Sequence, residues 1–306
     1  MDATTISPKP RAAGHPSAAR ARLQQLRLQW HVLTRNGLQK AAVIFIGILL
    51  FLAIFSPYVV PYPDAISGAV HAKDTLAAPS WSHPFGTDEM GRDMFSRVLY
   101  GSRISVTAGL VTVGLSVLIG ATLGVLAAGF GGVVEELIMR FVDIMLSFPT
   151  VILAIVIAAF WGGSLQTAVL ALAISWWPYH ARIVRGVAVS VRKRPYVRAA
   201  ESIGTSRLVQ IFRHILPASI GPLLVSASLD IGYVILSLAA LSFLGVGAQP
   251  PSPEWGLMIT QSRTYFMQAW WYMAFPGIAI TLTVLAFNLI GDGLGEVLNP
   301  KTRGRA

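Results

Sequence analysis

Residues 104–130 read ISVTAGLVTVGLSVLIGATLGVLAAGF, a run of 27 residues without a charged side chain. A helix of this length rises about 40 Å, which exceeds the roughly 30 Å hydrocarbon thickness of a bilayer. Glycines recur in the run, at Gly109, Gly114, Gly120, Gly124 and Gly129. Small residues at such intervals let helices approach closely in lipid, where no hydrophobic force drives helices together. The run therefore predicts a transmembrane helix in close contact with its neighbours.

Five further apolar runs of bilayer length lie on either side of this one. With it, they predict membrane spans at residues 38–60, 104–130, 137–160, 165–187, 217–245 and 271–294. The predicted fold is therefore an all-α integral membrane protein with six transmembrane helices.

Composition supports this fold class. Apolar residues make up 54% of the chain and charged residues 12%, about half the charged share of soluble domains. The net charge is +10 and cysteine is absent, so disulfides and thiolate chemistry are excluded. The first 37 residues are too long and too polar for a signal peptide, so we expect the N-terminal segment to be retained.

The distribution of Lys and Arg predicts an orientation. With the N-terminus inside, only five of the 24 basic residues fall in outer segments: Lys73, Arg92, Arg97, Arg103 and Arg263. The other 19 fall in inner segments, as the positive-inside rule requires. Both termini are therefore expected in the cytoplasm, and the high net charge needs no nucleic-acid partner.

The six spans divide the chain into four expected regions. Residues 1–37 form a cytoplasmic tail in which residues 19–33 fit a basic amphipathic helix lying on the membrane surface. Residues 38–103 hold the first span and a periplasmic segment. Residues 104–296 form a five-helix core that includes a cytoplasmic loop at 188–216. Residues 297–306 form a second cytoplasmic tail.

The basic cytoplasmic loop has the pattern of a helix–turn–helix. Pro195 suits the first turn of a short helix, and Gly204 suits the turn after it, where positive φ favours glycine. Thr205 or Ser206 can cap a second helix, and Pro217 can begin the fifth span. A merely basic loop would not need these residues at these intervals.

This loop resembles the cytoplasmic loop of permease subunits in binding-protein-dependent ABC importers. Their pattern is Glu-Ala-Ala, three residues, Gly, nine residues, Ile, one residue, Leu-Pro. Arg198 replaces the Glu and His214 replaces the Ile, while the other positions match. The resemblance implies that the loop docks into a groove on an ATPase subunit. The implied docking residues are Arg198, Ala199, Ala200, Glu201, Gly204, Leu216 and Pro217.

Three further stretches narrow the resemblance to the peptide and nickel branch of these permeases. They are HPFGTDEMGRDMFSR at 83–97, LSFLGVGAQPPSPEWG at 241–256 and NLIGDGL at 288–294. The chain is most similar to the C-type subunit of dipeptide and oligopeptide importers. That likeness implies a type I importer fold in the bacterial inner membrane. The implied partners are a B-type permease, two ATPase subunits, a periplasmic or lipid-anchored substrate-binding protein and membrane lipid.

The first of these stretches also predicts a short outer helix. Thr87 or Asp88 could cap it, with Glu89 in its first turn. This helix would lie in the outer interface and lead into the second span, where it would anchor the span or also meet the substrate-binding protein.

Carboxylates inside predicted spans are costly and rarely without function. Asp143 follows Arg140 by three residues, so we expect a local ion pair, and Asp292 lies near a span end. Asp230 has no basic neighbour in sequence and lies about 20 Å into the fifth span, at 1.5 Å per residue from Pro217. Asp230 is expected to line the pathway or to contact the partner permease.

Motifs for enzyme chemistry do not occur in the chain. No lysine ends a G-x-x-x-x-G-K-[ST] loop, and neither H-E-x-x-H nor G-x-S-x-G is found. No catalytic residue, cofactor or metal site is predicted, so ATP hydrolysis must come from partner subunits. Transport of nickel complexes or other peptide-like solutes, or an ion-coupled secondary transporter, are the alternatives to peptide import.

Overall fold

The computed structural model describes residues 36–298. These residues form helices and no strand beyond one isolated bridge between Thr87 and Asp93. The elements are α2 Gly37–Val59, η1 Pro63–Ile66, η2 Ala72–Asp74, α3 Met94–Phe130, α4 Gly132–Leu146, α5 Thr150–Phe160, α6 Leu165–Arg192, α7 Pro195–Ser202, α8 Arg207–Gln210, a π-helical turn Ile211–Ile215, α9 Leu216–Phe243, α10 Trp255–Ser262, η4 Arg263–Tyr265 and α11 Trp270–Leu298. The amphipathic helix predicted at 19–33 and the C-terminal tail lie outside the described residues.

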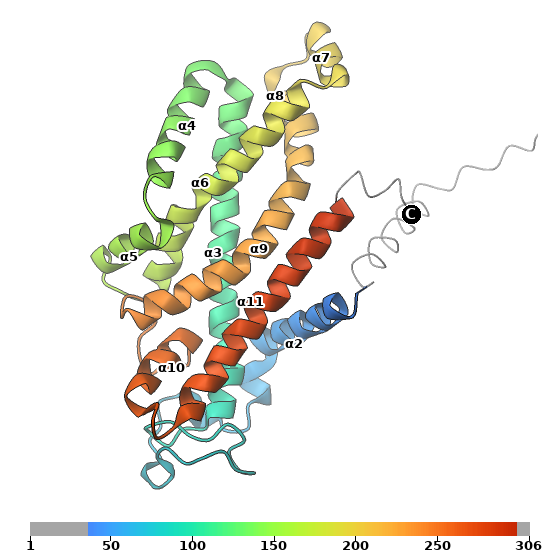
Figure 1. Cartoon of the computed structure of the whole chain (residues 1–306). Coiled ribbons are helices and arrows are strands. Elements are labelled where there is room, and N and C mark those ends of the chain that lie inside the picture. The colour runs from blue at the N-terminus through green and yellow to red at the C-terminus, as the bar shows by residue number, and fades with distance from the viewer. Residues whose placement is uncertain (1–35, 299–306) are drawn as a thin grey trace, which may run out of the picture.

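Helix α3 runs through the middle of the bundle and contacts α2, α6 and α9 (Figure 1). A Cβ atom at Gly120 would lie 2.4 Å from the carbonyl oxygen of Trp177, and one at Gly124 would lie 2.7 Å from that of Ala181. Both carbonyls belong to α6, so α3 and α6 approach closely at these glycines. Gly114 differs, because nothing lies within 4 Å of its Cβ position. The predicted close approach is confirmed for the other glycines of the run.

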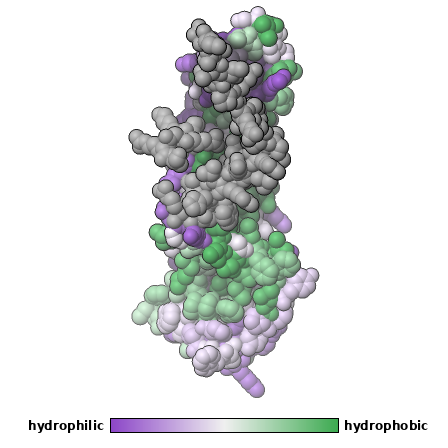
Figure 2. All heavy atoms as spheres, turned by 90° about the vertical axis from the view of Figure 1, so that its right-hand side faces the viewer, coloured by the Kyte–Doolittle hydropathy of each residue, from purple (hydrophilic) through white to green (hydrophobic). Residues whose placement is uncertain are grey.

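The two ends of the bundle differ in structure (Figure 1). The lower end of Figure 1 holds residues 60–105, which include the first turns of α3, and residues 247–269. We call these two segments the lower cap. The upper end holds residues 193–215, which we call the α7 tip. Figure 2 shows a band of hydrophobic side chains directly above the paler and more hydrophilic lower end. This band is the surface expected of a protein surrounded by lipid.

Four helices of the described residues are long and apolar enough to cross a membrane. They are α2, the continuous helix Arg207–Phe243, α3 and α11. The prediction that the fifth span begins at Pro217 is wrong, because α8, the π-helical turn and α9 follow one another without a break. Pro217 is tolerated there because a proline in the first turn of α9 lacks only a hydrogen bond that the π-helical turn already disturbs.

The third predicted span is not one straight helix. Helices α4 and α5 are bent by 88° at a break of a few residues. Pro149 is the N-cap of α5 and cannot donate a backbone hydrogen bond to a continuing α4. The pair is either one broken span or a re-entrant loop, so the prediction of a continuous helix over 137–160 is wrong.

The fourth predicted span, α6, has 28 residues but is not among the helices that are apolar enough to cross a membrane. Its first half is apolar, whereas Arg182, Arg185 and Arg192 lie in its second half. Length alone gives about 42 Å at 1.5 Å per residue, which exceeds the bilayer thickness. The structure therefore supports four or five apolar spans, and α6 is long enough without being apolar enough.

Candidate functional site

The α7 tip has the local geometry that the sequence predicts. Pro195 occupies the first turn of α7, and Gly204 has φ +81°. The Gly204 amide donates to the Glu201 carbonyl at 2.9 Å, and the Thr205 amide donates to the Ala200 carbonyl at 3.1 Å. These bonds satisfy carbonyls that the end of a helix leaves without partners.

The second helix of the tip begins as predicted. The Ser206 side chain accepts a hydrogen bond from the Val209 amide at the start of α8. The side-chain amide of Gln210 donates back to the Thr205 carbonyl at 3.2 Å. The predicted helix–turn–helix is therefore confirmed.

A few contacts hold the tip against the rest of the chain. Val197 is buried in a cluster with Val125 of α3, Val191 of α6 and Ile211. Arg192 donates to the carbonyl of Gly129 at 3.0 Å, and Arg207 donates to that of Phe130. One face of α7 thus packs on the bundle, and the tip is tied to the end of α3.

The remaining surface of the tip is exposed and partly apolar. Arg198, Ala199, Glu201 and Gly204 are exposed, and Ala200 is half-buried. Ile203 is 84% exposed and Phe212 66% exposed, and a hollow of about 360 Å³ is lined by Leu208, Val209, Phe212 and Arg213. Exposed large apolar side chains gathered in one place are typical of a protein-binding surface.

The structure brings five of the seven predicted docking residues together. Arg198, Ala199, Ala200, Glu201 and Gly204 share the tip, whereas Leu216 packs on the buried cluster of α3 and α6 and Pro217 lies beyond the π-helical turn. Ile203, Leu208 and Phe212 are exposed on the same tip and were not predicted from the sequence. Apolar residues in a basic polar loop were the available indication of these three.

Asp230 has polar neighbours that sequence adjacency could not indicate. Its Oδ2 atom accepts a hydrogen bond from Ser226 Oγ at 3.0 Å and lies 3.2 Å from His180 Nε2 of α6. The His180 side chain is fully buried, and its ring is close to the carboxylate without the alignment of a hydrogen bond. Asp230 has no basic neighbour in sequence, but His180 from another helix lies beside it in the structure.

The predicted ion pair between Arg140 and Asp143 is wrong. Arg140 lies 3.8 Å from Glu136, and Asp143 accepts a hydrogen bond from Arg182 of α6 at 2.7 Å. An i,i+3 pair can form on a helix, but Arg182 offers Asp143 a bond across two packed helices. The Asp143–Arg182 pair connects α4 to α6, whereas the Arg140–Glu136 pair lies within α4. The third carboxylate in the predicted spans, Asp292, is exposed on α11.

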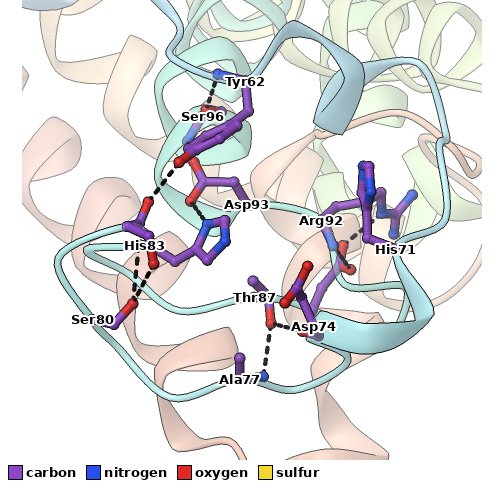
Figure 3. A network of polar contacts seen from close by, with 12 residues as sticks. Tyr62, His71, Asp74, Ala77, Ser80, His83, Thr87, Arg92, Asp93 and Ser96 are labelled. Atoms are coloured by element: carbon purple, nitrogen blue, oxygen red, sulfur yellow. Dashed lines mark hydrogen bonds and ion pairs between the residues drawn. The ribbon is translucent and has the colours of Figure 1, made fainter.

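The lower cap contains a network of polar contacts, seen in Figure 3. Asp93 is the N-cap of α3, since its side chain accepts from the Ser96 amide at 2.7 Å and its other oxygen lies 2.9 Å from His83 Nδ1. The Thr87 hydroxyl accepts a hydrogen bond from the Ala77 amide at 2.8 Å and donates one to the Asp74 carbonyl. The prediction that Thr87 or Asp88 caps a separate short helix is wrong, because one continuous helix begins at Met94.

Asp88, Arg92 and Arg97 form a buried group of charges in the lower cap. Arg92 Nε donates to Asp88 Oδ2 at 2.7 Å, and Arg97 Nε lies 3.4 Å from the same oxygen. All three side chains are at most 1% exposed. Arg97 also donates to the Ala65 carbonyl at 3.0 Å. One carboxylate therefore holds two arginines and joins the loop to the first turn of α3.

Two sequence stretches that carried the resemblance pack against each other here. A Cβ atom at Gly101 would lie 2.5 Å from the Pro253 carbonyl oxygen. The Trp255 indole donates to the Val98 carbonyl at 3.0 Å, and Ser105 lies 3.3 Å from the Glu254 carboxylate. Burial raises the pKa of Glu254, which caps α10. The lower cap is therefore assembled from segments about 150 residues apart.

Comparison with known proteins gives the class. Residues 120–304 match the family described as binding-protein-dependent transport system inner membrane component. Residues 24–79 match the N-terminal TM domain of oligopeptide transport permease C. The first match covers more than half of the chain, so this protein belongs to the inner-membrane permease family of binding-protein-dependent transport systems. It is a multi-pass inner-membrane protein.

Similarity to individual relatives covers almost the whole chain. The probable D,D-dipeptide transport system permease DdpC of Escherichia coli K12 is 46% identical over 93% of this chain and 94% of the relative. The dipeptide transport system permease DppC of Alkalihalophilus pseudofirmus is 43% identical over 89% and 88%. The glutathione transport system permease GsiD of Pectobacterium atrosepticum is 42% identical over 90% of each. The chain is a C-type permease of the dipeptide and oligopeptide branch.

Proposed function

We propose that this chain is one of two permease subunits of an ATP-driven importer, and that it carries short peptides inward across the inner membrane. The observation that carries this proposal is the exposed α7 tip. There the family pattern coincides with a short helix, Pro195–Ser202, that is followed by a turn with positive φ at Gly204. Relatives with full-length similarity are named for dipeptide and glutathione transport. Short peptides are accordingly the proposed substrates.

The proposed topology has six crossings with both termini in the cytoplasm. They are α2, α3, the bent pair α4–α5, α6, the helix Arg207–Phe243 and α11. Two observations support counting α6: its length, and its course from beside α5 to the α7 tip (Figure 1). Its arginines lie in the half near the tip, where the positive-inside rule expects them in the cytoplasm.

The α7 tip is proposed to dock on an ATPase subunit. Ala199 is exposed on α7, and small side chains allow a partner to approach closely. Ile203 and Phe212 would be buried in that contact, which would remove large apolar surface from water. Arg198, at the position of the family's Glu, would place a positive charge at the edge of the groove.

The other proposed partners follow the family. A B-type permease would complete the pathway, a second ATPase subunit would serve that permease, and a substrate-binding protein would deliver the solute. The lower cap would then face the periplasm and receive the binding protein.

Transport and topology can be tested separately. Proteoliposomes holding this chain with its partner subunits should accumulate labelled dialanine only with ATP and binding protein. Uptake by this chain without ATPase subunits would support a secondary transporter instead.

The topology is tested with single cysteines at Ser80 and Ser206, both exposed. In intact cells, an impermeant thiol reagent should label Ser80→Cys and leave Ser206→Cys unlabelled. Labelling of Ser206→Cys from outside would overturn the proposed orientation.

A further inference from the structure

Helix α9 has a polar stripe in an otherwise apolar span. Ser226, Asp230, Tyr233 and Ser237 occur at intervals of four, three and four residues. At 3.6 residues per turn they lie within about 60° of one another around the helix. Tyr233 is 54% exposed and the Asp230 side chain 16% exposed. The stripe therefore reaches the surface of this chain at the depth of Asp230.

One oxygen of the Asp230 carboxylate is held by the protein. Ser226 Oγ and His180 Nε2 both approach Oδ2, at 3.0 and 3.2 Å, and neither contact uses Oδ1. The side chain is thereby fixed with Oδ1 left for another group. A carboxylate at such depth in a span is costly unless it is paired.

His180 gives an independent indication of a polar ligand. Its ring is fully buried, and neither nitrogen has an aligned hydrogen-bond partner among the described residues. A Cβ atom at Gly120 of α3 would lie 2.6 Å from His180 Cβ, so α3 packs directly on this side chain. Because buried polar groups nearly always have partners, an imidazole held here beside Asp230 indicates that a polar group enters this site.

We propose that Asp230, with Ser226 and His180 behind it, forms a subsite in the translocation pathway for a primary ammonium group, such as the N-terminal amine of a peptide. An ammonium group offers three N–H donors, and a carboxylate is the strongest acceptor for them among side chains. In the continuous helix Arg207–Phe243, Asp230 lies 13 residues before Phe243, about 20 Å along the helix axis from that end. A solute halfway across would thus exchange water for this carboxylate. The inference rests on the proposed function, because it requires that the stripe face the pathway.

The test uses the absence of cysteine in this chain. Tyr233→Cys is placed in the assembled importer in proteoliposomes. The assembled importer is treated either with aminoethyl methanethiosulfonate, a primary ammonium, or with the sulfonatoethyl reagent, an anion of similar size. The subunits are then separated, and the rate at which this subunit is labelled is compared between the two reagents. We expect faster reaction with the cation. Asp230→Asn should lower the cation-to-anion rate ratio about tenfold, as expected when a charge about 6 Å away at a dielectric near that of water changes the two rates in opposite directions.

Leu224→Cys is the matched control, since Leu224 is 51% exposed on a different face of α9. Its rate ratio should not depend on Asp230. The subsite is overturned if Tyr233→Cys reacts with neither reagent, if the ratio is unchanged by Asp230→Asn, or if Leu224→Cys shows the same dependence. Uptake of dialanine by the unmodified importer is measured alongside. Loss of that uptake would contradict peptide import itself, whereas normal uptake with any of the three outcomes above would contradict only the subsite.

Discussion

The lower cap and the α7 tip hold their charged and small residues in opposite environments. In the lower cap, Asp88 and Arg97 are fully buried, and Gly101 touches a segment about 150 residues away. In the α7 tip, Arg198 and Glu201 are exposed and nothing lies within 4 Å of a Cβ atom at Gly204. Motifs of the same family thus serve internal packing at one end and leave a free surface at the other.

This difference separates two reasons for a fixed sequence pattern. The lower cap needs its residues because they contact one another, so a substitution there should cost stability in the isolated subunit. The α7 tip has no such internal requirement at Ala199 or Ile203, both exposed. A substitution there should cost function only when another protein is present.

The largest effect is expected from Ala199→Trp and Gly204→Val in the α7 tip. Each should abolish ATP-dependent uptake while leaving the subunit in the membrane. Ala199→Trp adds bulk to the exposed face of α7. Gly204→Val forces a β-branched residue to φ +81°, at a cost of about 1 kcal/mol or more. Uptake into proteoliposomes and co-purification of the ATPase subunits measure the result.

Gly204→Asn is the matched control for this prediction, because asparagine adopts positive φ more readily than valine. It should retain most of the uptake. Arg198→Glu, which restores the usual residue of the family, should also be tolerated. Wild-type uptake by both bulky variants would mean that the tip is not the docking element.

In the lower cap, Asp88→Asn should destabilise the isolated subunit strongly. It leaves Arg92 and Arg97 buried without their shared carboxylate, and breaking a buried pair costs about 3–5 kcal/mol. The melting temperature of the purified subunit in detergent measures this loss. Asp64→Asn is the control, because the Asp64–His71 pair of the same cap is about half exposed. Equal melting temperatures for the two variants would mean that the buried charges of the lower cap stabilise the subunit no more than its exposed ones.

The sequence predicted local features well, because these depend on neighbouring residues. The turn at Gly204, the cap at Ser206 and the glycine contacts of α3 all follow from short spacings. It failed where hydropathy and helix geometry disagree. The bend before Pro149 leaves an apolar run intact in sequence while it turns the helix by 88°.

The polar partners that come from distant segments also could not be predicted from the sequence. Asp143 pairs with Arg182 from another helix instead of its neighbour Arg140. His180 meets Asp230 from a position 50 residues earlier. Helix packing decides these partners, and a single sequence without its relatives gives no information on which faces of α4, α6 and α9 meet.

A smaller effect is expected from Gly101→Ala, also in the lower cap. The new methyl group would lie 2.5 Å from the Pro253 carbonyl oxygen and 2.7 Å from the Trp255 ring. Overpacking of this kind costs about 1–3 kcal/mol, so the melting temperature should fall. Gly114→Ala in the same helix meets nothing within 4 Å and should be neutral or slightly stabilising, since alanine favours helix. A matching loss at Gly114 would show that the requirement for glycine in α3 does not come from contact with the lower cap.

The smallest effect concerns the ion pair that joins α4 to α6 near the α7 tip. Arg185 donates to Glu135 at 2.7 Å, with side-chain exposures of 45% and 22%. Solvent weakens such a pair, so its contribution should be below about 1 kcal/mol. A double-mutant cycle with Glu135→Gln and Arg185→Gln, measured as melting temperatures of the subunit in detergent, should give a coupling within that limit. The coupling should shrink further in about 0.5 M salt, because exposed charges are screened at that ionic strength. A coupling as large as the loss from Asp88→Asn, and insensitive to salt, would mean that charges near the α7 tip are fixed as firmly as those of the lower cap. The contrast between the two ends would then not hold for electrostatics.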